Sequence, residues 1–310
     1  KMRRTVKYLL AAVLLTAVAM VLSGCGQRAL ESSLDEHTEE TAAYIRENVS
    51  SPVMGSVGGE WVVIGIAESG AETDQSYFDT YYDNIRAVVK SSEGVIHDTF
   101  YTDYARVTLA LCAIDRDPSD VEGYDLTQNF DRYDELTWQG ANAVAYTLIA
   151  ANVSGTQLQY EDEYLSYLID EIGKYIEKEN PQQTDYVSMG LAALSFYGDR
   201  EEAADMIDRA ASYLSTMQGD DGSMGNCEST AEAIMALSQS GVDVFSDERF
   251  IKNGVSLGES LMIYSSGDGG FRHAEDDGEA DQMATEKALI ALDSMKLFKE
   301  GRTLYERKAS

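Results

Sequence analysis

The sequence contains only three cysteines, and they give no sign of a disulfide framework. Cys25 belongs to an N-terminal leader, whereas Cys112 lies within an apolar helical pattern and Cys227 at the start of another. We therefore expect Cys112 and Cys227 to be two separate thiols. Proline is equally scarce, with three in 310 residues, and no Pro/Ser-rich linker divides the chain after the leader. The roughly 285 residues that remain suffice for one large domain with a sizeable buried core.

Positive charge is also scarce. The chain has 24 Lys and Arg against 54 Asp and Glu, which gives a formal net charge of −30 at pH 7. A surface this acidic repels nucleic acid and anionic lipid headgroups, so we expect no nucleic-acid partner. Solubility is a simpler explanation for the charge than a specific basic partner.

No stretch alternates with the two-residue period of a strand for long enough to argue for a sheet. Instead, a short helix rich in small and apolar residues recurs after a polar opening, at intervals of roughly forty residues. The clearest copy ends at Gly241, a residue favoured just past a helix end because it tolerates a left-handed backbone. The six copies are residues 60–70, 101–115, 138–152, 185–198, 224–241 and 281–295.

Longer amphipathic segments alternate with these copies, with charges on one face and apolar residues on the other. A first helix is predicted at residues 34–49, and longer ones follow at 75–90, 160–178, 201–218 and 247–264. Residues 126–135 are the weakest member, predicted as a turn or two before Trp138. The pattern predicts an all-α fold in which six charged outer helices surround six small-residue inner helices.

The first 24 residues form a separate segment. Lys1, Arg3, Arg4 and Lys7 precede an apolar run that is short for a membrane span. The tetrapeptide that follows, Leu22-Ser23-Gly24-Cys25, resembles the bacterial lipobox. This resemblance implies a signal peptide at residues 1–24, a lipid-modified, palmitate-type anchor on Cys25, and a tether through residue 33. The domain at 34–310 would then be held on the extracytoplasmic face of the cell membrane; an uncleaved anchor helix is the alternative.

Two loop-and-helix motifs carry a resemblance to a known family. They are Gln218-Gly219-Asp220-Asp221-Gly222-Ser223 before the helix with Ser229 and Thr230, and Gly269-Gly270-Phe271 before the helix with Asp281 and Thr285. Both are similar to the repeat of the prenyltransferase and squalene-cyclase superfamily. The first half, with Gly59-Glu60-Trp61 and Trp138-Gln139-Gly140, resembles a bacterial surface-lipoprotein branch. The resemblance implies an α6/α6 toroid around a central cavity, an architecture that also serves cobalamin-binding and thioester domains.

The catalytic motifs of that superfamily are missing from the matching positions. Protein prenyltransferases hold zinc with an Asp-x-Cys pair and a histidine. Here Asp281-Gln282-Met283 and Gly225-Asn226-Cys227 each lack one half of the pair, and His273 lies in a loop. The Asp-x-Asp-Asp acid of squalene cyclases and the thioester pattern are absent too. We therefore expect no metal, no cofactor and no catalytic residue of these types.

What remains is a set of polar and aromatic residues at the openings of the inner helices, which would converge on the mouth of a central cavity. The predicted ligand-binding residues are Glu60, Trp61, Tyr101, Tyr104, Arg106, Trp138, Gln139, Asn142, Asp185, Ser229, Asp281 and Gln282. The same residues could instead cap helices and fill the interior, with Arg106 neutralising Asp103 or Glu60.

Two functions stay open on this basis. The first is a non-catalytic, lipid-anchored toroid that binds a small molecule or a surface protein. The second is a terpenoid-cyclase or prenyltransferase-type enzyme with a rebuilt active site, which requires an apolar cavity deep enough for an isoprenoid and a shielded carboxyl. A cobalamin binder and a calcium site in the acidic loop 267–281 are narrower alternatives. The ligand and the oligomeric state do not follow from the sequence.

Overall fold

The computed structural model describes residues 30–178 and 183–306, and these are mainly helical, with two strands of two residues each. The predicted all-α class is confirmed. The predicted signal peptide at 1–24, the predicted lipidation site Cys25 and most of the predicted tether lie outside the described residues. Leu30, inside the predicted tether, is already packed in the core with 4% of its surface exposed. No helix in the described part of the chain is long and apolar enough to cross a membrane.

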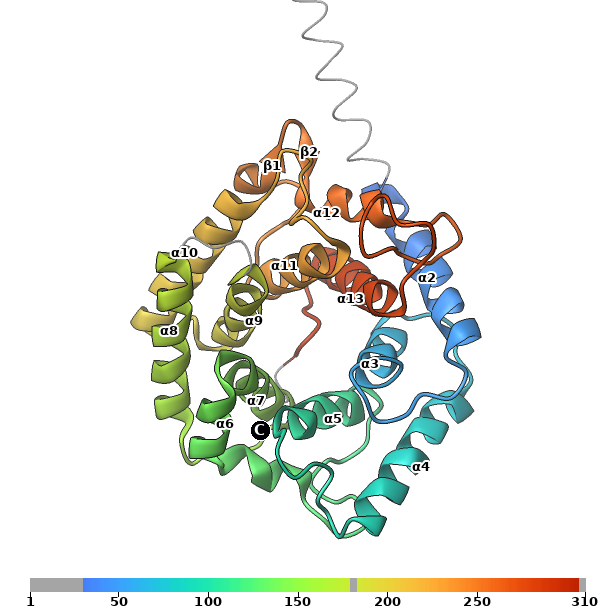
Figure 1. Ribbon diagram of the computed structural model, residues 1–310, viewed down its shortest axis with the longest axis vertical. Helices are drawn as coiled ribbons and strands as arrows, with labels where there is room; N and C mark the ends of the chain where they lie inside the picture. Colours follow the sequence, from blue (N-terminus) through green and yellow to red (C-terminus); the bar gives the residue numbers. More distant parts are fainter. Residues whose placement is uncertain (1–29, 179–182, 307–310) are drawn as a thin grey trace, which may run out of the picture.

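Six helices form an inner layer, and each agrees with a predicted small-residue segment to within a few residues. They are α3 (Glu60–Glu68), α5 (Thr102–Ala113), α7 (Ala141–Ser154), α9 (Thr184–Leu194), α11 (Cys227–Gln239) and α13 (Gln282–Lys299). Each contacts the next in order, and α13 returns to contact α3, which closes the circuit seen end-on in Figure 1.

The outer layer is made of longer helices that bury one face. They are α2 (Leu34–Asn48), α4 (Gln75–Ser91), α8 (Glu161–Glu177) and α10 (Glu201–Met217). All four match the predicted amphipathic helices, and they lie outside the inner helices in Figure 1. Their apolar residues recur every three to four positions, so one stripe packs inward while the charged face remains in solvent.

The predicted outer helix at 247–264 is wrong. This segment consists of a 3-10 turn η4 (Glu248–Phe250), strands β1 (Ile251–Lys252) and β2 (Val255–Ser256), helix α12 (Leu257–Ser260) and a second 3-10 turn η5 (Leu261–Tyr264). The strands pair antiparallel around Asn253-Gly254, both with positive φ, 51° and 87°. Asn-Gly is the strongest short hairpin signal. A helix cannot continue through two left-handed residues.

The boundary before α7 also differs from the prediction. The weakly marked segment forms a 3-10 helix η1 (Leu126–Asp131) and then α6 (Tyr133–Gln139), which contains Trp138. Gly140 follows with φ of 93° and separates α6 from α7. Trp138 therefore ends an outer element instead of opening an inner one.

Glycines let neighbouring helices approach closely, both between the two layers and within the inner layer. A Cβ added to Gly190 of α9 would lie 2.4 Å from the Ile172 Cδ1 of α8, and one added to Gly65 of α3 would lie 2.9 Å from the Leu289 Cδ2 of α13. Ile172 and Leu289 are completely buried. The glycines at these crossings thus set the distance between neighbouring helices.

We expect Gly190→Ala to lower the free energy of unfolding by about 1–3 kcal/mol, because the new methyl group overpacks a core without free space. Gly173→Ala on α8 is the matched control. Its Cβ would meet the Met206 Cε at an ordinary 3.6 Å, so removing a helical glycine should leave the protein equally stable or more stable. Denaturant unfolding of both variants checks this, and equal effects would contradict it.

Candidate functional site

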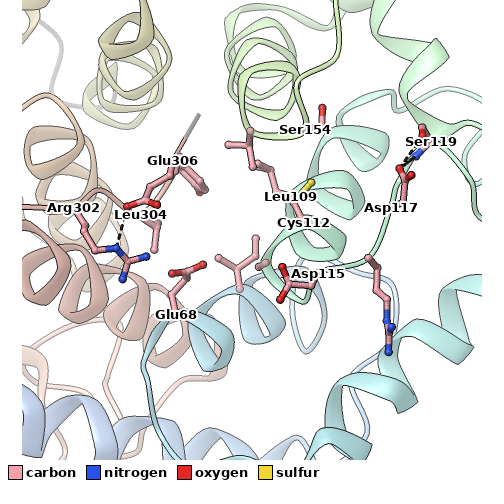
Figure 2. A pocket seen from close by; sticks show the side chains of 15 residues that line it. Glu68, Leu109, Cys112, Asp115, Asp117, Ser119, Ser154, Arg302, Leu304 and Glu306 are labelled. Carbon is pink, nitrogen blue, oxygen red and sulfur yellow. Dashed lines mark hydrogen bonds and ion pairs between the residues drawn. The ribbon is translucent and has the colours of Figure 1, made fainter. Parts of the chain in front are cut away.

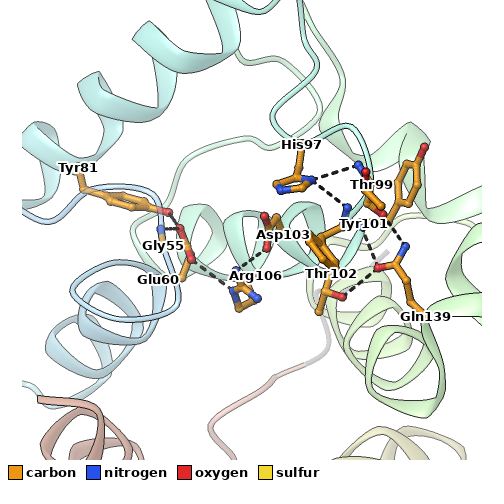
Figure 3. A network of polar contacts seen from close by, with 11 residues as sticks. Gly55, Glu60, Tyr81, His97, Thr99, Tyr101, Thr102, Asp103, Arg106 and Gln139 are labelled. Atoms are coloured by element: carbon orange, nitrogen blue, oxygen red, sulfur yellow. Dashed lines mark hydrogen bonds and ion pairs between the residues drawn. The ribbon is translucent and has the colours of Figure 1, made fainter. Parts of the chain in front are cut away.

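Glu60, the first residue of α3, is completely buried and connects three helices. Its carboxyl accepts hydrogen bonds from the Gly55 backbone N–H at 3.0 Å and from the Tyr81 hydroxyl of α4 at 3.3 Å. The Arg106 Nε of α5 lies 3.4 Å from the second oxygen, and Arg106 also pairs with Asp103. Figure 3 shows Arg106 between the two acids. Arg106 is expected from the sequence to pair with Asp103 or Glu60, and it contacts both.

Burial dominates the electrostatics of this group. Loss of solvation raises the pKa of Glu60 to about 7, although the Arg106 charge and the Gly55 hydrogen bond act in the opposite direction. Desolvation also raises the pKa of Tyr81 well above its usual range, and the neighbouring Glu60 adds to the effect. Glu60 therefore changes its protonation near neutral pH.

A second group meets across the middle of the ring. The Trp61 ring of α3 packs on Tyr146 of α7 with centroids 5.4 Å apart. Lys287 of α13 lies over Trp61, with its Nζ 4.1 Å from a ring centroid, a cation–π arrangement. The same ammonium forms an ion pair of 2.9 Å with Glu232 of α11, toward which the Tyr146 hydroxyl donates at 3.5 Å.

These contacts fix the direction of the inner helices. Trp61, Tyr146, Glu232 and Lys287 all lie in the first two turns of their helices, and α3, α7 and α11 are alternate members of the circuit. Their side chains meet across the axis, so the starts of these helices share one end of the ring, which we call the mouth. Tyr146, Glu232 and Lys287 are not among the predicted site residues, although the two charges are conspicuous in helices otherwise rich in Ala and Leu.

Tyr101, Tyr104 and Gln139 form a third group, at the start of α5. The Gln139 side chain accepts from the Tyr101 backbone N–H at 3.1 Å and donates to the Thr99 carbonyl at 2.8 Å. Tyr101 and Tyr104 stack with centroids 5.9 Å apart. Both line a cavity of about 680 Å³ on the outer side of α5. Gln139 thus holds the loop before α5, and the two tyrosines face away from the Trp61 group.

The remaining predicted residues lie at helix starts without forming one cluster. Asp281 caps α13 by accepting from the Ala284 N–H at 2.9 Å, and Gln282 donates to Glu286 at 2.7 Å. Ser229 is buried in the first turn of α11. Asn142 and Asp185 each have a buried side-chain oxygen, Oδ1, that has no hydrogen-bond partner within the described residues.

Among the predicted ligand-binding residues, Trp138 stands out because 78% of its surface is exposed. Its neighbour Gln139 is tied into the fold by the hydrogen bonds to the loop before α5, which hold the end of α6 in place. The indole is therefore presented to solvent from an anchored helix end.

The opposite end of the ring contains a cavity of about 590 Å³. Figure 2 shows Glu68, Asp115 and Glu306 directed toward this space. Burial raises the pKa of Glu68 to about 7, while the Arg302 charge lowers it and Glu306 and Asp115 raise it further. The cavity lining is therefore more acidic than basic, with Arg116 and Arg302 as counter-charges.

No group of three or more His, Cys, Asp and Glu side chains in residues 30–178 and 183–306 is arranged to hold a metal ion. His273 pairs with Glu228 through Nδ1 at 2.8 Å. The Cys227 thiol is buried and contacts the Ala284 carbonyl at 3.6 Å, and burial raises its pKa strongly. Cys112 and Cys227 form no disulfide with each other.

Comparison with known proteins assigns no family: no protein-family model matches the chain, and no curated protein matches it.

The raised pKa of Glu60 predicts that the free energy of unfolding depends on pH. Its pKa is higher in the folded protein than the ordinary value of 4.5, so its protonated form favours folding. The stability it contributes is complete below pH 4.5 and is lost as the pH rises through about 7. We expect the wild type to lose up to about 3 kcal/mol relative to Glu60→Gln between pH 4.5 and 8. Denaturant unfolding across this range measures the difference.

The control substitution is Glu47→Gln, at an exposed position near the end of α2. Its difference from the wild type should remain constant across the same pH range. A constant difference for Glu60→Gln as well would contradict the assignment of a raised pKa to this carboxyl.

Proposed function

We propose that the chain is an α6/α6 toroid that binds a ligand with an apolar surface at its mouth, without catalysis. In this proposal the resemblance to the prenyltransferase and cyclase superfamily concerns architecture, and a lipid on Cys25 holds the domain on the extracytoplasmic face of a membrane. The closed circuit of six inner helices supports the toroid. The ligand is a small molecule or a protein partner.

The main support for a binding site at the mouth is the position of the exposed apolar side chains. Of the eight large hydrophobic residues that are exposed in the described chain, five lie in the first turn of an inner helix or within three residues before it. These are Val57, Phe100, Trp138, Tyr186 and Met283. We call them the rim. Apolar side chains gathered on an otherwise acidic protein are typical of an interaction site.

The interior of the mouth supports recognition of a polar group as well. Arg106 and Lys287 have 17% and 14% of their side-chain surfaces exposed, so each charge is largely shielded but still reached by solvent. The free oxygens of Asn142 and Asp185 add acceptors at the starts of α7 and α9. A ligand with an apolar body and a polar end fits this combination.

The enzyme alternative has one observation in its favour, the raised pKa of the shielded Glu60 carboxyl, since perturbed carboxyls are common in active sites. Two features weigh against it. Glu60 is engaged by Gly55, Tyr81 and Arg106. The Trp61 and Tyr146 rings pack together across the axis, with centroids 5.4 Å apart, where an isoprenoid chain would have to lie.

We expect Trp138→Ala to change the free energy of unfolding by less than about 0.5 kcal/mol, because the indole is mostly in solvent. The same variant should lose a molecule that the wild type retains when purified from its own host. Native mass spectrometry of the full-length proteins in detergent, with metal analysis on the same samples, measures this.

Tyr124→Ala is the matched control, since Tyr124 is an exposed aromatic residue outside the rim, and this variant should retain the molecule. If wild type and Trp138→Ala carry the same ligand at equal occupancy, the rim is not the binding site. One equivalent of zinc, or an isoprenoid product formed on incubation, would favour the enzyme.

A further inference from the structure

The C-terminal segment 302–306 lies inside the ring. After α13 the chain reverses at Gly301, with φ of 75°, and the Arg302 N–H donates to the Leu297 carbonyl at 2.9 Å. In Figure 1 the segment, in red, runs across the middle of the inner helices. Leu304 and Tyr305 are only 6% and 3% exposed. The segment therefore occupies the central space from the end opposite the mouth.

A single side chain of the ring holds the backbone of this segment. Gln239, at the end of α11, donates from Nε2 to the Tyr305 carbonyl at 2.8 Å and accepts from the Tyr305 N–H at 3.0 Å. One residue thus has both backbone groups satisfied by one amide, as in a hydrogen-bonded pair of antiparallel strands. This recognition requires an extended backbone and does not depend on the side chain that the residue carries.

The Tyr305 side chain supplies the second part of the contact. The aromatic ring of Tyr305 is buried. Burial is the main cause that raises the pKa of the Tyr305 hydroxyl, and the nearby charge of Glu232 is the second, so this hydroxyl lies near Glu232 at the centre of the helical ring. This hydroxyl has no hydrogen-bond partner among the described residues. A buried hydroxyl without a partner costs stability. The site that holds Leu304 and Tyr305, which we call the seat, therefore does not satisfy every polar group of Tyr305.

Few other bonds connect the segment to the ring. The Thr303 hydroxyl donates to the Tyr305 carbonyl, and Arg302 pairs with Glu306, so these contacts stay within the segment. The acidic cavity beside it is still open, with a volume of about 590 Å³. Among the described residues, the Gln239 amide and the two buried side chains are therefore the main contacts that oppose its exchange for another chain.

We propose that the seat of Leu304 and Tyr305 is a binding site for an extended peptide segment with a large aliphatic residue followed by an aromatic one. The chain's own C-terminal segment occupies this site and competes with a peptide from a partner protein. Gln239 recognises the peptide backbone, and the interior near Glu232 accepts the aromatic ring. This site lies opposite the rim, so it stands or falls independently of the proposed ligand at the mouth.

The test uses the full-length chain with Tyr305→Ala, which weakens the internal occupant, and the capped peptide Arg-Thr-Leu-Tyr-Glu, the sequence of residues 302–306. Calorimetry should show that the variant binds the peptide at least tenfold more tightly than the wild type, whose site is occupied. A peptide with alanine in place of tyrosine, and the double variant Gln239→Ala/Tyr305→Ala, should each bind at least tenfold more weakly. Equal binding in all four combinations, or none with a folded variant, overturns the proposal.

A measurement on the wild type remains decisive if the variant does not fold. Amide hydrogen exchange should show the Tyr305 N–H exchanging at least tenfold faster than that of Met235 in the middle of α11, because the segment opens locally. Millimolar peptide should accelerate exchange at Tyr305 and leave Met235 unchanged. Exchange at Tyr305 that is as slow as at Met235 and insensitive to the peptide overturns the proposal.

Discussion

Closure of the ring depends on the seam between α3 and α13, the first and last inner helices. The absence of a side chain on Gly65 lets Leu289 approach, and a small cluster of buried residues from α2, α3 and α13 covers the seam. Polar contacts reinforce it: Glu286 accepts from the Gly58 N–H at 2.8 Å across a separation of 228 residues. Because the seam joins the two ends of the described chain, every inner helix has a neighbour on both sides only while it holds.

The small size of the inner residues and the burial of charge follow from this closed arrangement. An inner helix packs against two neighbours and an outer element, so little of its surface is left for solvent. Two of the charged groups inside the ring, Arg106 and Lys287, are paired with acids. Arg106 forms ion pairs with Glu60 and Asp103. Lys287 forms an ion pair with Glu232 and a cation–π contact with the Trp61 ring. Removing one member of such a pair leaves its partner buried without compensation, which is strongly unfavourable.

The two ends of the ring differ chemically. The starts of the inner helices carry exposed apolar side chains and two largely shielded cations, whereas the opposite end is acidic and partly filled by residues 302–306. The Tyr305 ring approaches Glu232, and Glu232 pairs with the Lys287 that lies over Trp61. Glu232 and Lys287 thus lie between the two ends of the ring.

Local pattern was enough to predict the helices, because the spacing of apolar residues every three to four positions shows which face of a segment is buried. It failed at 247–264, where the Asn253-Gly254 turn overrides that spacing, and at Trp138, where Gly140 moves the start of the inner helix. The seam, the contact of Trp61 with Tyr146 and the insertion of Tyr305 were decided only by the tertiary structure. Spacing along a helix describes one surface, and these contacts depend on how several such surfaces close around a common axis.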